Sequence, residues 1–251
     1  MNMMGRKALG HHFFVIDHQM ILHFDSEVYR KFYSVIDFET FEIIQSNGST
    51  FHYFKDKNHV YIDSYMNSFD ILPGANPADF QILDFEKGMA SSGNADYLFE
   101  QRLPHRFSAY EALSGLYQKV GNKIYCFYHH ELAEADVETF EVLYPSEVQN
   151  VAKDKNHVYF RDQLVPDADA ESFHFLAECF TADYYRERDH TYYAKDKNVA
   201  YYVDTISKAF KVIKTKNLAN FHFKVIGELG YAFDGQYQYL FGKRKKIEAK
   251  S

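Results

Sequence analysis

The chain has 251 residues, 46% of them hydrophobic and 18% aromatic, and it carries a formal net charge of −7. This length is sufficient for a large core, and 21 Tyr and 24 Phe without any Trp are typical of short strands that pack on both faces. Residues 243–250 carry five positive charges and one negative, so the rest of the chain stands at −11. The acidic body argues against broad binding to phosphate backbones and is compatible with a basic protein partner.

The basic segment 243–250 by itself suggests a nucleic acid or an anionic membrane as partner. We expect instead a frayed polar end, and we predict neither of these two partners. The N-terminal residues hold two basic side chains but no long apolar run, and no later stretch approaches the length of a membrane span. We therefore expect no signal peptide and a cytoplasmic location.

Several kinds of chemistry have no signature in the sequence. The 12 Gly are scattered, with no GxGxxG, GxxxxGK[ST] or GxSxG pattern. His130 and Glu131 resemble half of an HExxH zinc motif, but Glu134 stands where the second His belongs. Neighbouring His129 and His130 are expected to point to opposite faces of a strand. We predict no catalytic residue, no metal and no cofactor, and we expect Cys126 and Cys179 to be buried thiols.

Taken in chain order, the predicted elements are short strands joined by tight turns. After a polar lead-in over residues 1–12, strands are expected from residue 13, and Asn47-Gly48 between apolar runs predicts a hairpin. The stretches KDKNHVYI, KDKNHVYF and KDKNVAYY then begin at Lys55, Lys153 and Lys195. Each predicts a strand, a turn and a strand. The Asp of the turn can accept hydrogen bonds from amides two or three residues on, and the Asn is expected to be left-handed, with a bulge.

A second pattern, D-x-E-[ST]-F, lies between these hairpins. It occupies residues 37–41, 136–140 and 169–173, with looser copies at 76–80 and 217–221. An Asp or Asn at its start is a good N-cap, so the pattern predicts one short turn of helix or 3₁₀ helix that places a Phe in the core.

The two patterns together indicate a repeat protein. Worn turns at Asp17, Gly121 and Asp234 complete about six units, which begin near residues 13, 51, 117, 148, 191 and 230. Residues 84–118 interrupt the spacing and are either an unrecognised unit or an insertion, with a short helix expected near 109–116. The predicted fold is a single, mainly β domain over residues 1–251, a repeat array of twisted hairpins with short helical turns and one irregular insertion. Open, solenoidal and closed arrays all fit this pattern.

KDKNHVY followed by D-x-E-T-F resembles the DKNYY repeat family of bacterial proteins. The resemblance covers most of residues 51–202 and, more weakly, the remainder. It implies the repeat itself, and it implies no catalytic residues, because the family has no general assigned function.

Repeats without motif chemistry and an acidic body predict a non-catalytic protein-binding protein, and more narrowly an immunity protein that neutralises a basic bacterial toxin. Insertions in repeat arrays often carry the binding function, so the expected contact residues lie there. They are Glu86, Asp96, Tyr97, Glu100, Tyr110 and Glu111. Two alternatives are an enzyme of hydrolase type whose site only the fold assembles, and a module that binds carbohydrate through exposed Tyr.

Overall fold

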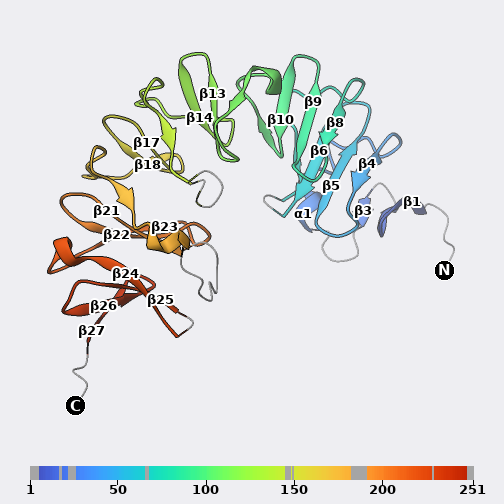
Figure 1. Ribbon diagram of the computed structural model, residues 1–251. Coiled ribbons are helices and arrows are strands. Elements are labelled where there is room, and N and C mark those ends of the chain that lie inside the picture. The colour runs from blue at the N-terminus through green and yellow to red at the C-terminus, as the bar shows by residue number, and fades with distance from the viewer. Residues whose placement is uncertain are drawn as a thin grey trace. The chain divides into compact units, whose positions relative to one another are not determined.

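The computed structural model describes residues 6–16, 19–21, 27–65, 68–144, 148, 150–181, 191–227 and 229–247. The chain is mainly β, as predicted, and it forms two compact units, Met1–Tyr110 and Glu111–Ser251 (Figure 1). Every sheet is an antiparallel meander in which each strand pairs with the next strand in the chain. None of the helices among the described residues has the length and hydrophobicity to cross a membrane.

Among its described residues, the first unit contains one three-stranded and two four-stranded sheets. The three-stranded sheet comprises β1 (Arg6–Gly10), β2 (Phe13–Ile16) and β3 (Gln19–Ile21), and helix α1 (Glu27–Arg30) follows it. The next sheet comprises β4 (Glu42–Ser46), β5 (Phe51–Lys55), β6 (Val60–Ser64) and β7 (Asp70–Ile71). The third comprises β8 (Gln81–Asp84), β9 (Met89–Ser92), β10 (Ala95–Leu98) and β11 (Gln101–Arg102), followed by the 3₁₀ helix η1 (Phe107–Ala109).

The second unit contains four sheets of four strands. The first two comprise β12 (Glu111–Ala112), β13 (Tyr117–Val120), β14 (Lys123–Cys126) and β15 (His130–Glu131), and then β16 (Glu141–Val142), β17 (Val151–Lys153), β18 (Val158–Phe160) and β19 (Gln163–Leu164). The third comprises β20 (His174–Phe175), β21 (Thr191–Lys195), β22 (Ala200–Asp204) and β23 (Ala209–Ile213), with helix α2 (Glu178–Thr181) between its first two strands. The last follows the 3₁₀ helix η2 (Leu218–Asn220) and comprises β24 (His222–Ile226), β25 (Leu229–Phe233), β26 (Tyr237–Leu240) and β27 (Lys243–Lys246).

The predicted hairpins are confirmed. Each KDKN turn joins the second and third strands of its sheet, and Asn47-Gly48 lies in the turn between β4 and β5. The predicted turn at Asp17 lies outside the described residues. The D-x-E-[ST]-F segments form single hydrogen-bonded turns, such as the one closed by the N–H of Thr40 on the carbonyl of Asp37, and Phe41 at their end is fully buried.

Residues 84–118 belong to repeat units although the sequence pattern of the repeat is not recognisable in them. Of the two alternatives for this region, the structure contains the extra unit, because β8 to β11 form the same four-stranded meander as the neighbouring sheet. The expected helix near 109–116 is absent: η1 ends at Ala109, and Glu111–Ala112 pair with β13 as a strand. Cross-strand pairing therefore overrides the local helix signal in this segment.

Three smaller expectations were wrong. The Asn residues of the KDKN turns do not have positive φ, because the Asp side chain rather than a left-handed residue closes the turn. Residues 243–246 are not frayed but pair with β26 over four residues. The rings of His129 and His130 lie 4.2 Å apart rather than on opposite faces, because His129 still belongs to the turn that precedes β15.

Candidate functional site: the turn hubs and the junction row

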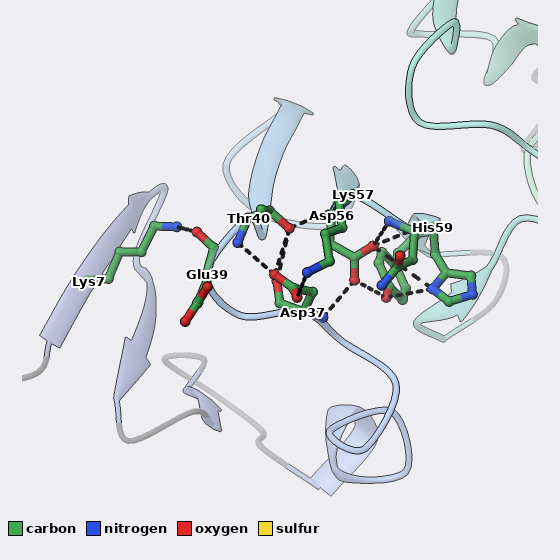
Figure 2. Close-up of polar contacts among 9 residues, drawn as sticks. Lys7, Asp37, Glu39, Thr40, Asp56, Lys57 and His59 are labelled. Atoms are coloured by element: carbon green, nitrogen blue, oxygen red, sulfur yellow. Dashed lines mark hydrogen bonds and ion pairs between the residues drawn. The ribbon is translucent and has the colours of Figure 1, made fainter.

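Asp56 lies in the turn between β5 and β6, and its carboxylate holds that turn closed. Its Oδ1 accepts the backbone N–H groups of Asn58 and His59, each at 2.7 Å. Its Oδ2 accepts the N–H of Asp37 at 2.8 Å and the hydroxyl of Tyr61 at 2.7 Å (Figure 2). These four hydrogen bonds use the acceptor positions of a buried carboxylate, so none is left for a cation such as Ca²⁺. We call this arrangement a turn hub.

The residue after the Asp provides a second link to the same segment. The N–H of Lys57 donates to Oγ1 of Thr40 at 3.0 Å, and its ammonium group lies 2.6 Å from the carboxylate of Asp37. The Asp37 carboxylate also accepts the N–H of Thr40 at 3.0 Å (Figure 2). Asp56 and Lys57 therefore fix both ends of the D-x-E-T segment, residues 37–40, which precedes the sheet β4 to β7.

The hub recurs three times in the second unit. Its centres are Asp154, Asp196 and Asp234, whose Oδ2 atoms accept the N–H groups of Asp136 at 2.9 Å, Asp169 at 2.9 Å and Lys216 at 3.1 Å. A Tyr five residues after each Asp donates its hydroxyl to the same oxygen, from Tyr159 at 2.9 Å, Tyr201 at 2.6 Å and Tyr239 at 2.7 Å. The spacing of Asp and Tyr in the turn motif thus has a direct structural cause.

Charge and burial around the hubs shift several pKa values. The Lys57 ammonium, followed by the Thr40 hydroxyl, lowers the pKa of Asp37 to about 2, and Lys197 and Ser172 do the same for Asp169, also to about 2. Burial opposes ionisation of the hub carboxylate Asp154, but its backbone and Tyr hydrogen bonds outweigh this and lower its pKa. Burial, with the neighbouring Asp234 carboxylate, raises the pKa of Tyr239 to about 12. The hub acids Asp154 and Asp196 are therefore held ionised and the phenol of Tyr239 neutral.

The sheet β8 to β11 contains a hub with the polar groups exchanged. Ser92 occupies the Asp56 position and accepts the N–H of Asn76 on its Oγ at 2.8 Å. The carboxylate comes from the segment instead, because Asp79 stands where Thr40 stands in the preceding unit and accepts the Ser92 hydroxyl at 2.5 Å. The hub thus keeps one carboxylate and one hydroxyl, but the hydroxyl is in the turn and the carboxylate is in the segment.

A second recurring device joins one sheet to the segment of the next. Lys195, at the end of β21, donates to the carbonyl of Phe221 at 3.4 Å, and Lys153, at the end of β17, donates to the carbonyl of Ala170 at 3.4 Å. In the first unit Lys7 donates to the carbonyls of Glu39 and Phe41, each at 3.1 Å (the Glu39 bond is drawn in Figure 2). These lysines hold consecutive sheets together.

One exposed position repeats beside the hubs, and we call it the junction row. It is the first residue of the first strand in each four-stranded sheet, directly after the aromatic residue that ends the turn segment. Its cross-strand partner is a Lys in four of the six sheets. The row comprises Glu42 and Gln81 in the first unit, and Glu111, Glu141, His174 and His222 in the second.

The side chains of the junction row line grooves between consecutive sheets. In the first unit, a groove of about 240 Å³ is lined by Glu42 with Lys55 and Pro77, and one of about 560 Å³ by Glu42 with Lys7 and Glu39. In the second unit, a groove of about 720 Å³ lies between the sheets β20 to β23 and β24 to β27. It is lined among others by His174, Glu178, Lys195 and His222.

Lys195 differs from its counterparts in this setting. Lys55 pairs with Glu42 at 3.4 Å and Lys153 with Glu141 at 3.5 Å, both across strands. In the groove of about 720 Å³ the corresponding acid is replaced by His174. Nδ1 of His174 and of His222 lies 2.8 and 2.7 Å from a backbone carbonyl, so each Nδ1 carries the hydrogen and each Nε2 is left for another partner.

The structure places the six expected contact residues in different settings. Glu86 and Glu111 are exposed, Tyr110 is half-buried, and Glu111 belongs to the junction row. Asp96 is 3% exposed and binds Arg106 at 3.0 Å, and Tyr97 is fully buried, with its hydroxyl on the carbonyl of Pro73. Glu100 is half-buried and one of its carboxylate oxygens is enclosed. Asp96 and Tyr97 thus support the fold, and Glu111 lies in a different unit from the other five.

Sequence reasoning missed most of the junction row and both exchanged hub residues, Ser92 and Asp79. The row was detectable, because each member follows the last aromatic residue of a turn segment, as Glu42 follows Phe41. The exchanged hub was not, since Ser and Asp in reversed order do not resemble Asp and Thr. Within the described residues, no three His, Cys, Asp or Glu side chains are arranged to hold a metal ion.

Comparison with known proteins identifies a family. The sequence profile of the DKNYY family matches residues 117–251, which contain three of the four Asp hubs found among the described residues. The fourth, around Asp56, has the same hydrogen bonds although it lies outside the matched range. No curated protein and no solved structure matches the chain. With more than half of its length matched by this profile, the chain belongs to the DKNYY family.

Proposed function

We propose that this chain is a non-catalytic protein-binding protein, and more narrowly a cytoplasmic immunity protein that binds and neutralises a basic toxin domain. The observation that carries the proposal is the contrast between hub and junction row. The hubs repeat with nearly constant chemistry, whereas the exposed row beside them changes from Glu to Gln to His. Repeat proteins bind partners in this way, with a constant scaffold and variable exposed positions.

Charge supports a basic partner. Residues 1–110 hold 14 Asp and Glu against 9 Lys and Arg. Exposed acids there include Glu39, Asp70 and Glu86. Complementary charge speeds association and disfavours wrong partners, and blocking a toxin needs a matching surface rather than chemistry of its own.

The test begins with the tagged full-length chain as bait in its own cells. A stoichiometric basic partner that is toxic when expressed alone, and harmless when this chain is co-expressed, supports the proposal. Glu86→Lys and Glu111→Lys are then expected to weaken protection, each compared with Glu171→Lys, an exposed acid outside the row. A captured partner without toxicity, or protection unchanged by acid reversals across both units, contradicts the immunity role.

One observation favours a second candidate, an enzyme of hydrolase type. The groove of about 720 Å³ is lined by four ionisable side chains, His174, Glu178, Lys195 and His222. Screening the purified chain against ester, phosphoester and glycoside substrates tests this reading. An activity lost in His222→Gln and kept in His130→Gln, which changes a His outside the groove, would favour the enzyme over the binding protein.

A further inference from the structure

The C-terminal part of the second unit has an excess of basic side chains, although the chain as a whole is acidic. Residues 205–247 hold nine Lys and Arg and two Asp and Glu, while the chain as a whole has a net charge of −7. All nine cations are exposed. They are Lys208, Lys211, Lys214, Lys216, Lys224, Lys243, Arg244, Lys245 and Lys246.

These cations also lack ion pairs. Several exposed lysines elsewhere in the chain pair with acids, as Lys87 does with Asp84 at 3.0 Å and Lys123 with Glu131 at 2.8 Å. Within the part of the chain that the structure describes, none of the nine is within ion-pair distance of a carboxylate. Their charge is therefore available to an external anion.

Exposed apolar side chains occupy the hairpin tips among these cations. Ile206 is 58% exposed in the turn between β22 and β23, Ile226 is 49% exposed at the end of β24, and Phe241 is 40% exposed in the turn between β26 and β27. Lys208 and Lys243 lie two residues after Ile206 and Phe241. Each of these tips thus combines a solvent-exposed apolar group with a nearby cation, whereas Lys214, Lys216 and Lys246 lie at the opposite, hub end of their sheets.

The three tips lie at corresponding ends of neighbouring sheets. In an antiparallel meander, the turns before and after a hub turn lie at the opposite end of the sheet, which places Ile226 and Phe241 together, away from Asp234. Lys195 beside one hub and Gly235 in the next line the same groove, so the two hub ends are adjacent. The Ile206 tip, away from the Asp196 hub, therefore lies on the same side.

We propose that this end of the sheets β20 to β27 docks on the surface of an anionic lipid bilayer. Lys and Arg near such a surface are attracted by the negative headgroups, and apolar side chains gain by entering the boundary between headgroups and acyl chains. Nucleic acid matches the cations equally well but offers little to three exposed aliphatic and aromatic tips. The proposal is independent of the proposed immunity role, because it uses different residues.

The test measures co-sedimentation of the full-length chain with sucrose-loaded vesicles. Vesicles of phosphatidylcholine alone are compared with vesicles that contain one quarter phosphatidylglycerol, at low and at high salt. We expect binding to the anionic vesicles only, with release at high salt because screening weakens it. Lys208→Gln with Lys243→Gln, and separately Ile206→Ser with Phe241→Ser, are each expected to reduce the partition coefficient at least tenfold.

A matched control removes the same charge elsewhere. Lys87→Gln with Lys123→Gln changes two exposed lysines that are ion-paired, and it is expected to leave the partition coefficient within twofold. All the substituted residues are exposed, and far-ultraviolet circular dichroism checks that each variant is folded. Equal losses in the control and the Lys243 variant overturn the proposal, as does failure to bind anionic vesicles. Binding of a single-stranded oligonucleotide without vesicle binding would reassign the cations to nucleic acid.

Discussion

The Asp56 carboxylate accepts the backbone N–H of Asp37 at 2.8 Å, although 19 residues separate them in the chain. The same bond recurs between Asp154 and Asp136 and between Asp196 and Asp169, across 18 and 27 residues. The Asp that closes each tight turn is thus also the group that anchors the preceding segment.

Replacing a hub Asp by Asn should destabilise the second unit. In Asp196→Asn, the new amide NH₂ faces groups that donate, namely the Asp169 N–H and the Tyr201 hydroxyl, so at least one buried donor loses its acceptor. An unsatisfied buried polar group costs about 1–3 kcal/mol. Urea unfolding followed by circular dichroism should show this loss, while Glu171→Gln, at an exposed acid nearby, should shift the midpoint little. Equal midpoints for the two variants would contradict the hub role.

Acid should destabilise the protein through the segment carboxylates. The pKa of Asp169 is lowered from 3.8 to about 2 by Lys197, so the folded state binds its proton less readily than the unfolded state. The stabilisation is complete above about pH 4 and is lost as the pH falls through about 2. Urea midpoints measured between pH 7 and pH 2 should fall in this window, and less steeply in Asp169→Asn. An identical slope in that variant would exclude Asp169 as a contributor.

Alkali should act through the hub phenols. Burial and Asp234 raise the pKa of Tyr239 to about 12, above its ordinary 10.0, so its contribution is complete below about pH 10 and is lost as the pH rises through about 12. Absorbance at 295 nm should show the hub tyrosines titrating later than the exposed ones, and together with unfolding. Tyr239→Phe should remove one late-titrating phenol and cost about 1 kcal/mol for the lost hydrogen bond.

The exchanged hub provides a double-mutant test. Ser92→Asp alone places a second carboxylate beside Asp79, whose oxygen lies 2.5 Å from the Ser92 hydroxyl, and like charges so close are destabilising. Adding Asp79→Thr restores the Asp and Thr arrangement of Asp56 and Thr40. We expect the double variant to recover most of the loss, with a coupling energy of about 1–3 kcal/mol in urea unfolding. Additive effects would show that the two side chains do not form a hub.

Alanine substitutions at two glycines with positive φ distinguish the cost of backbone strain from the cost of a steric clash. A Cβ at Gly242 would lie 2.8 Å from the Tyr202 ring, whereas one at Gly121 would meet no atom within 4 Å. Gly121→Ala should therefore cost about 1 kcal/mol from its backbone conformation alone. Gly242→Ala should cost about 1–3 kcal/mol more because it also overpacks the contact between two sheets. Thermal unfolding of the pair measures the difference.

The turn motif could be predicted from the sequence because its contacts are local. Asp56 binds amides two and three residues ahead and a Tyr five residues ahead, so one short stretch contains the whole arrangement. The partner segment could not be assigned in this way. A turn segment lies on either side of this hairpin, at residues 37–41 and 76–80. The equal spacing of 24 residues from Asp17 to Phe41 and from Asp56 to Phe80 pairs each turn with the segment that follows, whereas the bond of Asp56 runs to the segment before it.

The candidate sites were harder to predict, because they depend on the direction of side chains and on charges that different strands bring together. Tyr97 is an expected contact residue of the irregular insertion, but strand pairing places its side chain in the core. The cations beside the exposed tips are not apparent from the continuous run 243–250, because Lys208 and Lys224 come from other hairpins.

The direction of the hub bonds affects how the chain can fold during synthesis. When a turn such as that of Asp154 leaves the ribosome, its partner segment around Asp136 has already been made, so the bond can close at once. The lysine links form in the opposite order, because Lys153 is synthesised before Ala170, whose carbonyl it binds. Each sheet can therefore be completed from residues already present and then joined to its successor. Such pairing between consecutive strands favours rapid, sequential folding.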